Sequence, residues 1–472
     1  MSLFRKKSIP DLIKTTQQGR TLRKELNAWD LTLLGIGAII GTGIFVLTGE
    51  GALKAGPGLI LSFVVAGLAC AFAALSYAEF ASTVPVSGSV YTYSYAIMGE
   101  FWAWIIGWDL ILEYLLAVSA VSAGWSGYFQ SLLEGFGIHL PTVLTAAPGA
   151  VPGKTTLFNL PAFLIVMLLT FLLARGIRES KRANNVMVVL KVAVVLAFIF
   201  VGVWYVKPAH WQPFTPFGWD GIFNAAALVF FAYLGFDAVS TAAEETRNPG
   251  RDLPRGILYS LGICTLLYVV VSGILTGIVR YPEFKGYEDR PVALALQTVG
   301  QNWFAGFISL GAILGMTTVM LVMLYGQTRV IFAMSRDGLL PRGFSTVHEK
   351  FRTPFGATWI SGTVAALIGA LVPLGDIAEL VNMGTLAAFV MISIAVIILR
   401  KTQPDLPRAF RCPAVPWIPL LAILFCVLLL AHLPLITWIR FAIWLAIGFA
   451  IYFTYSRKRS SLNTQSTIHL DQ

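Results

Sequence analysis

Apolar runs recur along this chain at the length needed to cross a lipid bilayer, which is roughly 17 to 25 residues for a helix. Twelve such runs alternate with short polar or basic segments, and they lie at about 29–53, 57–83, 99–131, 159–174, 183–205, 220–244, 254–279, 302–333, 356–373, 378–399, 414–432 and 435–455. The run at 159–174 is short, and the last two runs are only narrowly separated. The pattern predicts an all-α polytopic membrane protein with twelve transmembrane helices.

The composition agrees with this class of protein. Hydrophobic residues occupy 57% of the 472 positions and charged residues only 12%, whereas soluble domains carry about 25% charged residues. Three of the four cysteines lie within apolar runs and none forms a CxxC pair, so we expect small apolar fillers, not disulfides or metal ligands. We expect no cleavable signal peptide before the first run.

The distribution of positive charge predicts the orientation in the membrane. If the N-terminus is cytoplasmic, 26 of the 34 lysines and arginines fall in cytoplasmic segments, which follows the positive-inside rule. The segment 84–98 is the exception, because it holds no lysine or arginine; its tyrosines predict a short interfacial helix. We therefore expect both termini in the cytoplasm and contact with membrane lipids, and no binding of nucleic acid.

The first apolar run is interrupted in its middle by Gly41, Thr42 and Gly43. Each glycine costs a helix about 1 kcal/mol relative to alanine, and unwound backbone persists at membrane depth only where it is buried in protein or lines a cavity. The sixth run is interrupted in a similar way, because Gly235 and Asp237 lie in mid-segment. Interrupted segments in corresponding positions of two inverted halves indicate a transporter binding site at the bilayer midplane.

Spans 1 and 6 would begin two halves of five spans each, and the odd number gives the halves opposite orientations. The predicted organisation is a basic cytoplasmic N-tail, two inverted repeats of five helices each, a final pair of helices and a polar, disordered cytoplasmic C-tail. These parts correspond to residues 1–28, 29–205, 206–399, 400–458 and 459–472. The longest outer loop, about 132–158, is expected to pack on the outer face.

Unwinding near 41–43 and 233–236 would expose backbone groups that suit an α-amino acid. The N–H groups of a half-helix beginning at Ile44 suit a carboxylate, and the carbonyl groups ending near Ile40 and Phe231 suit an ammonium group. The predicted substrate contacts are the residues of the two breaks: Ile40, Thr42, Gly43, Ile44, Phe231, Ala232 and Leu234. The alternative is that the glycines only permit close helix packing.

Lys191 lies about eight residues into span 5. A charged lysine at that depth is costly, and buried lysines change their protonation state readily. The functional interpretation is a proton-binding group whose ammonium replaces a coupling cation near the first break. The alternatives are a structural salt bridge, for example with Glu113 or Glu79, and a lysine at the cytoplasmic boundary.

The apolar runs contain the acidic residues Glu79, Asp109, Glu113 and Asp237, among others. For Asp109 and Glu79 we favour a structural ion-pair network, while Glu113 fits a network and a gate or proton path about equally well. Asp237 is a possible gate residue, and as an acid it also suits the start of the second half of span 6. The motifs HExxH, G-x-S-x-G and Walker A are missing, so we expect no enzyme activity, no ATP-driven transport, no metal and no cofactor besides a proton.

Several motifs together resemble the amino acid–polyamine–organocation transporters, and within them the bacterial branch of the cationic amino acid transporter family. They are residues 35–45 in span 1, 85–89 after span 2, 235–237 with 244–245 and 248–249 in and after span 6, and 334–341 after span 8. The resemblance covers about 20–458. It implies a LeuT-like five-plus-five inverted repeat and an alternating-access carrier, in which a span 5 lysine, matched by Lys191, takes the place of a bound sodium.

The expected function is therefore secondary active transport of L-amino acids across a bacterial plasma membrane. We favour proton-coupled symport of neutral small or branched aliphatic substrates, with Lys191 as the proton site. An amino acid exchanger, a carrier of cationic amino acids and a sodium symporter are the transport alternatives. The non-transport alternative is an amino acid-sensing transceptor or a subunit of a larger assembly, and the sequence leaves a small membrane-protein partner open.

Overall fold

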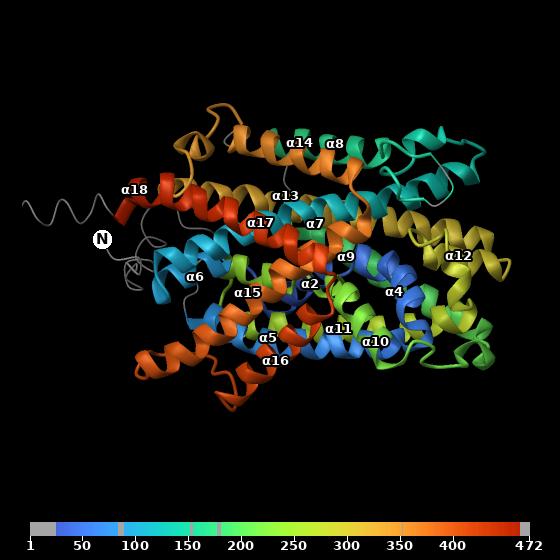
Figure 1. Cartoon of the computed structure of the whole chain (residues 1–472), viewed down its shortest axis with the longest axis horizontal. Helices are drawn as coiled ribbons and strands as arrows, with labels where there is room; N and C mark the ends of the chain where they lie inside the picture. Colours follow the sequence, from blue (N-terminus) through green and yellow to red (C-terminus); the bar gives the residue numbers. More distant parts are fainter. Residues whose placement is uncertain are drawn as a thin grey trace, which may run out of the picture.

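The computed structural model describes residues 25–83, 89–151, 153, 155–176, 181–351 and 353–462. Within these ranges the regular elements are helices, and one isolated bridge joins Leu26 to Thr246 (Figure 1). The predicted all-α class is confirmed for this part of the chain. The basic N-tail up to residue 24, the motif residues 85–88 and the tail from residue 463 lie outside the described residues.

The helices follow the predicted apolar runs closely. In chain order they are α2 (Ala28–Ile39), α3 (Thr42–Phe45), α4 (Leu47–Ala55), α5 (Leu59–Thr83), α6 (Ser89–Ile97), α7 (Glu100–Gly135), α8 (Leu160–Ala174), α9 (Lys181–Gly202), α10 (Gly218–Val229), α11 (Pro249–Ile278), α12 (Pro291–Thr298), α13 (Asn302–Arg336), α14 (Phe355–Leu371), α15 (Leu374–Thr402), α16 (Trp417–Ala431), α17 (Leu435–Ile451) and α18 (Arg457–Arg459). The 3-10 helices η5 (Phe230–Tyr233) and η6 (Phe236–Glu245) follow α10, and the short π-helix η9 (Tyr452–Ser456) follows α17.

Seven helical segments of the described chain are long and apolar enough to cross a membrane: Leu47–Thr83, Glu100–Gly135, Asn185–Tyr205, Pro249–Ile278, Asn302–Arg336, Leu374–Thr402 and Leu435–Arg459. The apolar helices α2, α8, α14 and α16 are shorter. At 1.5 Å per residue, a helix of 15 residues spans only about 22 Å of a hydrocarbon core about 30 Å thick. The protein is thus a multi-pass membrane protein, while the full set of twelve spans stays a prediction.

Local sequence explains where individual helices begin. Asn27 accepts hydrogen bonds from the backbone N–H groups of Trp29 and Asp30, and Asp30 accepts one from the N–H of Asn27, which forms a capping box at the start of α2. Helix α11 begins five residues earlier than expected, because Pro249 suits the first turn of a helix.

The structure also differs from the sequence-based prediction at the end of α7 and near the C-terminus. Helix α7 continues to Gly135, into the segment predicted as a loop. Beyond it, the Thr156 hydroxyl donates to the carbonyl of Ala147 within the segment, and the N–H of Asn159 donates to the carbonyl of Ala370 in α14. The expectation of disorder after Arg459 is wrong for residues 460–462, since Ser460 is fully buried.

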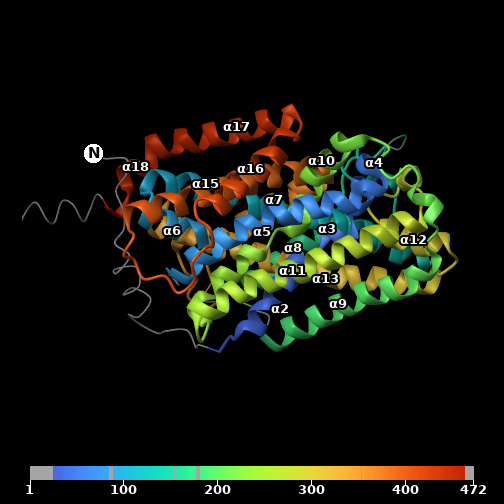
Figure 2. The same ribbon diagram turned by 90° about the horizontal axis from the view of Figure 1, so that it is seen from below.

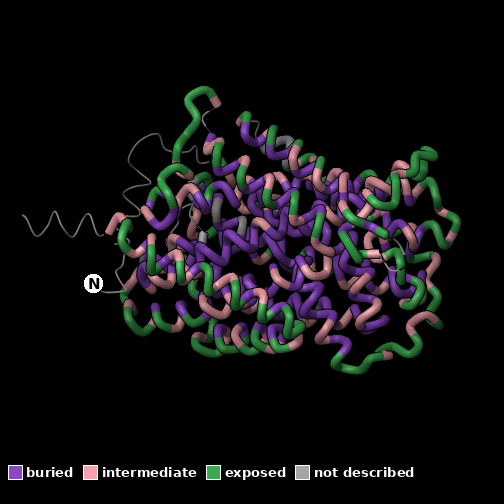
Figure 3. The backbone as a smooth tube through the Cα atoms, turned by 45° about the horizontal axis from the view of Figure 1, so that its top comes forward, coloured by how far each residue is buried: buried purple, intermediate pink, exposed green. Residues whose placement is uncertain are grey.

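The long helices run side by side along the longest axis of the molecule (Figures 1 and 2). Helices α6 and α18 lie at one end, which we call the α6 end, and α4 and α12 lie toward the other. Buried residues fill the centre of the bundle (Figure 3). Large apolar side chains are exposed on its outside, for example Leu164 of α8, Phe200 of α9 and Ile443 of α17, as expected for helices that face lipid.

The expected network at Glu79 is confirmed. This carboxylate is fully buried at the end of α5, and it accepts hydrogen bonds from Nε and Nη2 of Arg400 at 2.8 and 2.9 Å and from the N–H of Cys412 at 2.8 Å. Nε of Arg408, whose side chain is 1% exposed, lies 3.1 Å from the same carboxylate. Glu79 therefore fastens the segment after α15 to the end of α5.

We expect Glu79→Gln to destabilise the protein strongly, because it leaves Arg408 buried without its counter-charge. Breaking a buried ion pair in this way costs about 3–5 kcal/mol, which should lower the apparent melting temperature of the detergent-purified protein by several degrees. The control is Asp376→Asn, which removes an ion pair with Arg440 whose partners are more than a third exposed; exposed pairs contribute about 0–1 kcal/mol. Equal losses in the two variants would contradict the buried-network interpretation.

Candidate functional site

The first predicted break is present, slightly earlier than expected. Helix α2 ends at Ile39, Ile40 is extended with ψ at 105°, and Gly41 has φ −162° and ψ −136°. Gly41 takes the N-cap position, so the next helix begins at Thr42; the expected start at Ile44 is wrong. A second interruption at Val46, which the sequence did not indicate, separates α3 from α4.

The second break lies at Leu234 and Gly235, within the predicted segment 233–236. Leu234 is extended, and Gly235 has φ +106°, a left-handed conformation that glycine adopts without steric cost. The chain on both sides is 3-10 helix, which the sequence did not predict. Asp237 lies in the first turn of η6, where an acid complements the helix dipole.

The two breaks touch each other at the level of the backbone. A Cβ atom added to Gly43 would lie 2.2 Å from Cα of Ala232, and one added to Gly235 would lie 3.0 Å from the carbonyl carbon and oxygen of Ala38. The close-packing interpretation of these glycines is therefore correct. It is compatible with a binding site, because the contact brings the unwound backbone of both spans to one place.

Tyr268 of α11 ties the breaks together. Its hydroxyl oxygen lies 2.9 Å from the carbonyl oxygen of Ile39 and 2.8 Å from that of Ala232. A hydroxyl has one proton, so Tyr268 donates fully to only one of these carbonyls at a time. Sequence reasoning missed this residue, because a tyrosine within a long apolar run gives no signal of its own.

We call the place where the two breaks touch, at Gly43 and Ala232, the crossing. The predicted contact residues lie around it and are closed off from solvent. Phe231 and Leu234 are 6% exposed, and Ile40, Ile44 and Ala232 are at most 1% exposed. The described chain has a recess at the α6 end and another of about 560 Å³ around Lys54 and His432. The predicted contact residues line neither of these two recesses. In this arrangement of the helices the predicted contact residues are therefore closed to solvent.

Polar groups of α3 are available at the crossing. The Thr42 side chain is buried, and its hydroxyl has no hydrogen-bond partner among the described residues. The first N–H groups of any helix have no acceptor within that helix, and here they belong to Thr42, Gly43 and Ile44. A hydroxyl and a set of N–H groups thus lie together beside the second break.

Lys191 lies beside the first break, as expected. Its side chain is 1% exposed, and Nζ donates a 2.8 Å hydrogen bond to the carbonyl oxygen of Gly37, near the end of α2. The aliphatic part of the side chain packs against Gly315 of α13. Glu79, one of the salt-bridge partners considered for this lysine, is held by two arginines. Lys191 thus joins α9 to α2 through this hydrogen bond.

Two further acids lie one turn apart on α7. Asp109 is 4% and Glu113 5% exposed. Gly384 of α15 faces Asp109, since an added Cβ would lie 2.5 Å from its Oδ1 atom, and that oxygen has no hydrogen-bond partner among the described residues. The acids therefore lie in the contact between α7 and α15, away from the surface.

The sequence is similar to those of known transport proteins. The sequence model of the amino acid permease family matches residues 26–456. The chain is 68% identical to a branched-chain amino acid permease of Bacillus subtilis (strain 168), over 98% of this chain and 99% of that protein. It is 55% identical to a methylthioribose transporter of the same organism, with the same coverage. A branched-chain amino acid permease of Lactococcus lactis subsp. cremoris (strain MG1363) is 36% identical over 92% of this chain and 95% of that protein.

We expect Gly43→Ala to disrupt the crossing, because its new methyl group would overlap the backbone of Ala232, which cannot move aside as a flexible side chain can. Overpacking of this kind costs about 1–3 kcal/mol or more. The measurement is the apparent melting temperature and the yield of monodisperse protein. Gly262→Ala, at a helical position of α11 with no atom within 4 Å of the added Cβ, is the matched control and should be neutral. A tolerated Gly43→Ala would show that the two breaks do not touch.

Proposed function

The chain belongs to the amino acid permease family, and we propose that it carries neutral small or branched aliphatic L-amino acids across a bacterial plasma membrane in symport with protons. The observation that carries this proposal is the contact between two helix breaks, which gathers backbone donors and acceptors in a closed, largely apolar environment. The 68% identity to a protein named a branched-chain amino acid permease supports this choice of side chain.

The first part of the proposal concerns the common part of an amino acid. The N–H groups at the start of α3, with the Thr42 hydroxyl, bind the substrate carboxylate. Carbonyl oxygens at the ends of the two interrupted helices, at Ile40 and Phe231, accept hydrogen bonds from its ammonium group. Helix termini supply charge complementarity of this kind without charged side chains.

The second part concerns selectivity for the side chain. Ile44, Phe231 and Leu234 form an apolar wall, which suits an aliphatic group and disfavours a charged one. The buried acids Glu113 and Asp237 lie outside this wall in the proposal and act in a gate or ion-pair network.

The third part concerns energy coupling. A charged Lys191 binds the carbonyl of Gly37 and fixes α2 against α9, and a neutral amine holds that carbonyl more weakly. Proton loss therefore loosens the first half of span 1. Substrate and proton couple because each stabilises one arrangement of the helices more than the other. The twelve-span, five-plus-five arrangement with both termini cytoplasmic, and the proton as the only coupling ion, belong to the same proposal.

The substrate class is tested by thermal stabilisation of the purified protein with leucine, isoleucine, valine, alanine, arginine and methylthioribose. We expect the aliphatic amino acids to raise the melting temperature, with a larger rise for a ligand that binds more tightly at equal concentration. Methylthioribose is the second candidate because of the 55% identity to its transporter. Stabilisation by methylthioribose alone, or by arginine alone, would refute the proposed substrate class.

We expect Lys191→Ala to retain amino acid exchange in proteoliposomes and to lose accumulation driven by an imposed pH gradient, because the proton site is gone. Lys207→Ala, at an exposed lysine outside the helices, controls for the loss of a cation and should accumulate normally. Undiminished gradient-driven uptake by Lys191→Ala would rule out the assignment. Uptake by the unchanged protein that requires sodium would favour a sodium symporter, and exchange without any response to the gradient would favour an exchanger.

A further inference from the structure

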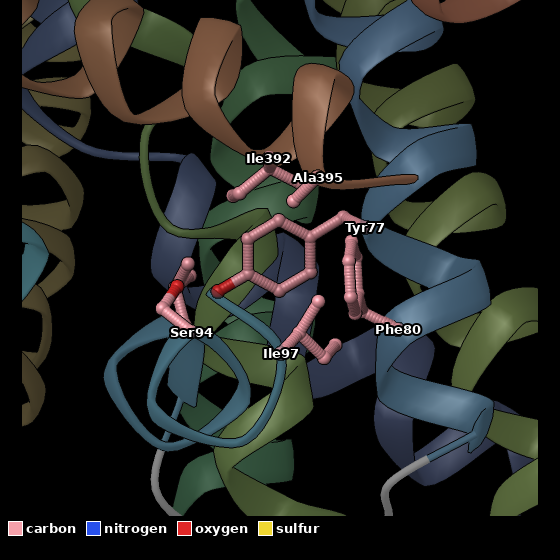
Figure 4. Close-up of a pocket in the computed structure, with 7 residues that line it drawn as sticks. Tyr77, Phe80, Ser94, Ile97, Ile392 and Ala395 are labelled. Carbon is pink, nitrogen blue, oxygen red and sulfur yellow. The ribbon is translucent and has the colours of Figure 1, made fainter. Parts of the chain in front are cut away.

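At the α6 end, helix α6 covers the ends of α5 and α15 (Figure 4). A cavity of about 10 Å³, the space that one water molecule needs, remains under it. The cavity is lined by residues of these three helices: Tyr77, Phe80, Val90, Ser94, Ile97, Ile392 and Ala395. Helix α6 also packs on η6, the second half of the interrupted sixth span. Any opening between α5, α15 and η6 at this end must therefore displace α6.

A short C-terminal segment, residues 456–462, lies across this end, and we call it the C-terminal strap. The Ser456 hydroxyl donates to the carbonyl of Leu339 at 2.6 Å, and the N–H of Ser461 donates to the carbonyl of Asp337 at 3.0 Å. The strap packs directly on the backbone of Gly338, since a Cβ atom added to this glycine would lie 2.2 Å from the carbonyl oxygen of Arg459. The strap is thus fixed to the chain that leaves α13.

The strap is joined to α6 through the buried carboxylate of Glu100. This residue is fully buried at the start of α7, and it accepts hydrogen bonds from three hydroxyl groups: Tyr95 of α6 at 3.2 Å, Tyr452 of η9 at 3.3 Å and Ser460 of the strap at 2.5 Å. Burial and the neighbouring Glu100 raise the pKa of Tyr95 well above its ordinary value, so its hydroxyl keeps the proton that it donates.

A second connection runs parallel to the first. The Tyr91 hydroxyl of α6 donates to Oδ2 of Asp337 at 2.8 Å, and the backbone carbonyl of the same Asp337 holds Ser461. Burial and the charge of Asp337 raise the pKa of Tyr91. Both ends of α6 are therefore joined to the strap through one intermediate residue. The strap begins at Ser456, the last residue of the single-turn π-helix η9, and π-helical turns occur frequently at functional positions.

We propose that residues 456–462 act as an intramolecular strap that holds α6 over the α6 end and so stabilises the closed state of this end of the transporter. The proposal rests on the proposed transport function for its role, and its contacts are independent of what the protein carries. The strap has no described contact with the two breaks. Its release therefore changes how often this end opens and leaves the composition of the substrate site unchanged.

The test uses a reporter under α6. Ile392, which lines the cavity and is 4% exposed, is changed to cysteine in a full-length protein whose four native cysteines are replaced by alanine. Maleimide labels this cysteine only when α6 moves away. Ser460→Ala removes one hydrogen bond to the buried side chain of Glu100, which corresponds to about a tenfold change in the open fraction. We therefore expect about tenfold faster labelling in Ser460→Ala than in the protein with an intact strap.

Two further variants make the test specific. Tyr452→Phe removes a different hydroxyl from the same carboxylate and should also speed labelling. Thr454→Ala is the matched control, because this exposed hydroxyl bonds only within its own helical turn, to the carbonyl of Ala450; its labelling rate should not change. Melting temperatures show whether a variant has lost its fold. If Ser460→Ala is unfolded, the labelling rate of Tyr452→Phe decides the test, and the reverse holds if Tyr452→Phe is unfolded.

Unchanged labelling in folded Ser460→Ala or Tyr452→Phe would overturn the strap. Acceleration in Thr454→Ala equal to that in Ser460→Ala would overturn it as well, because the effect would then be a general loosening of the C-terminus. Labelling is measured without substrate. A failure of the strap is therefore distinguishable from a failure of the proposed function, which would appear in the stabilisation panel and leave the labelling rates unaffected.

Discussion

The backbone contact between Gly43 and Ala232 is the constraint on which the centre of this protein depends. No side chain separates the two interrupted spans there, so their unwound backbone is enclosed by neighbouring helices and shielded from lipid. Unpaired backbone groups in that environment would cost several kcal/mol each. Tyr268 and Lys191 reduce this cost, because each donates a hydrogen bond to a backbone carbonyl group near a break.

The polar chemistry is divided between the middle and the α6 end. At the crossing, the available polar groups are backbone amides, carbonyls and one threonine hydroxyl. Toward the α6 end, buried carboxylates hold chain segments together: Glu79 binds two arginines, and Glu100 collects three hydroxyl groups. The proposed alternating-access mechanism requires both features, a centre that binds through adaptable groups and an end that closes by specific contacts.

Most helices and both breaks could be predicted because they depend on local signals, namely apolar run length and glycines in mid-run. The helix start at Thr42 was misplaced by two residues, since Gly41 and Gly43 look alike in sequence and only the contact with Ala232 distinguishes their roles. Tyr268 was missed because its partners are 229 and 36 residues away along the chain. Ser460 was assigned to a disordered tail because its partner, Glu100, lies 360 residues away.

The sequence by itself determined the membrane class of the protein, the positions of the interrupted spans and the presence of a lysine within an apolar run. These properties follow from composition and from short-range backbone preferences, which act wherever the chain folds. Only the tertiary structure decided that the two breaks meet, that Tyr268 joins them, that Lys191 reaches Gly37 and that the C-terminal segment is linked to α6 through Glu100 and Asp337. Each of these is a contact between distant parts of the chain, and its geometry exists only once the helices have packed.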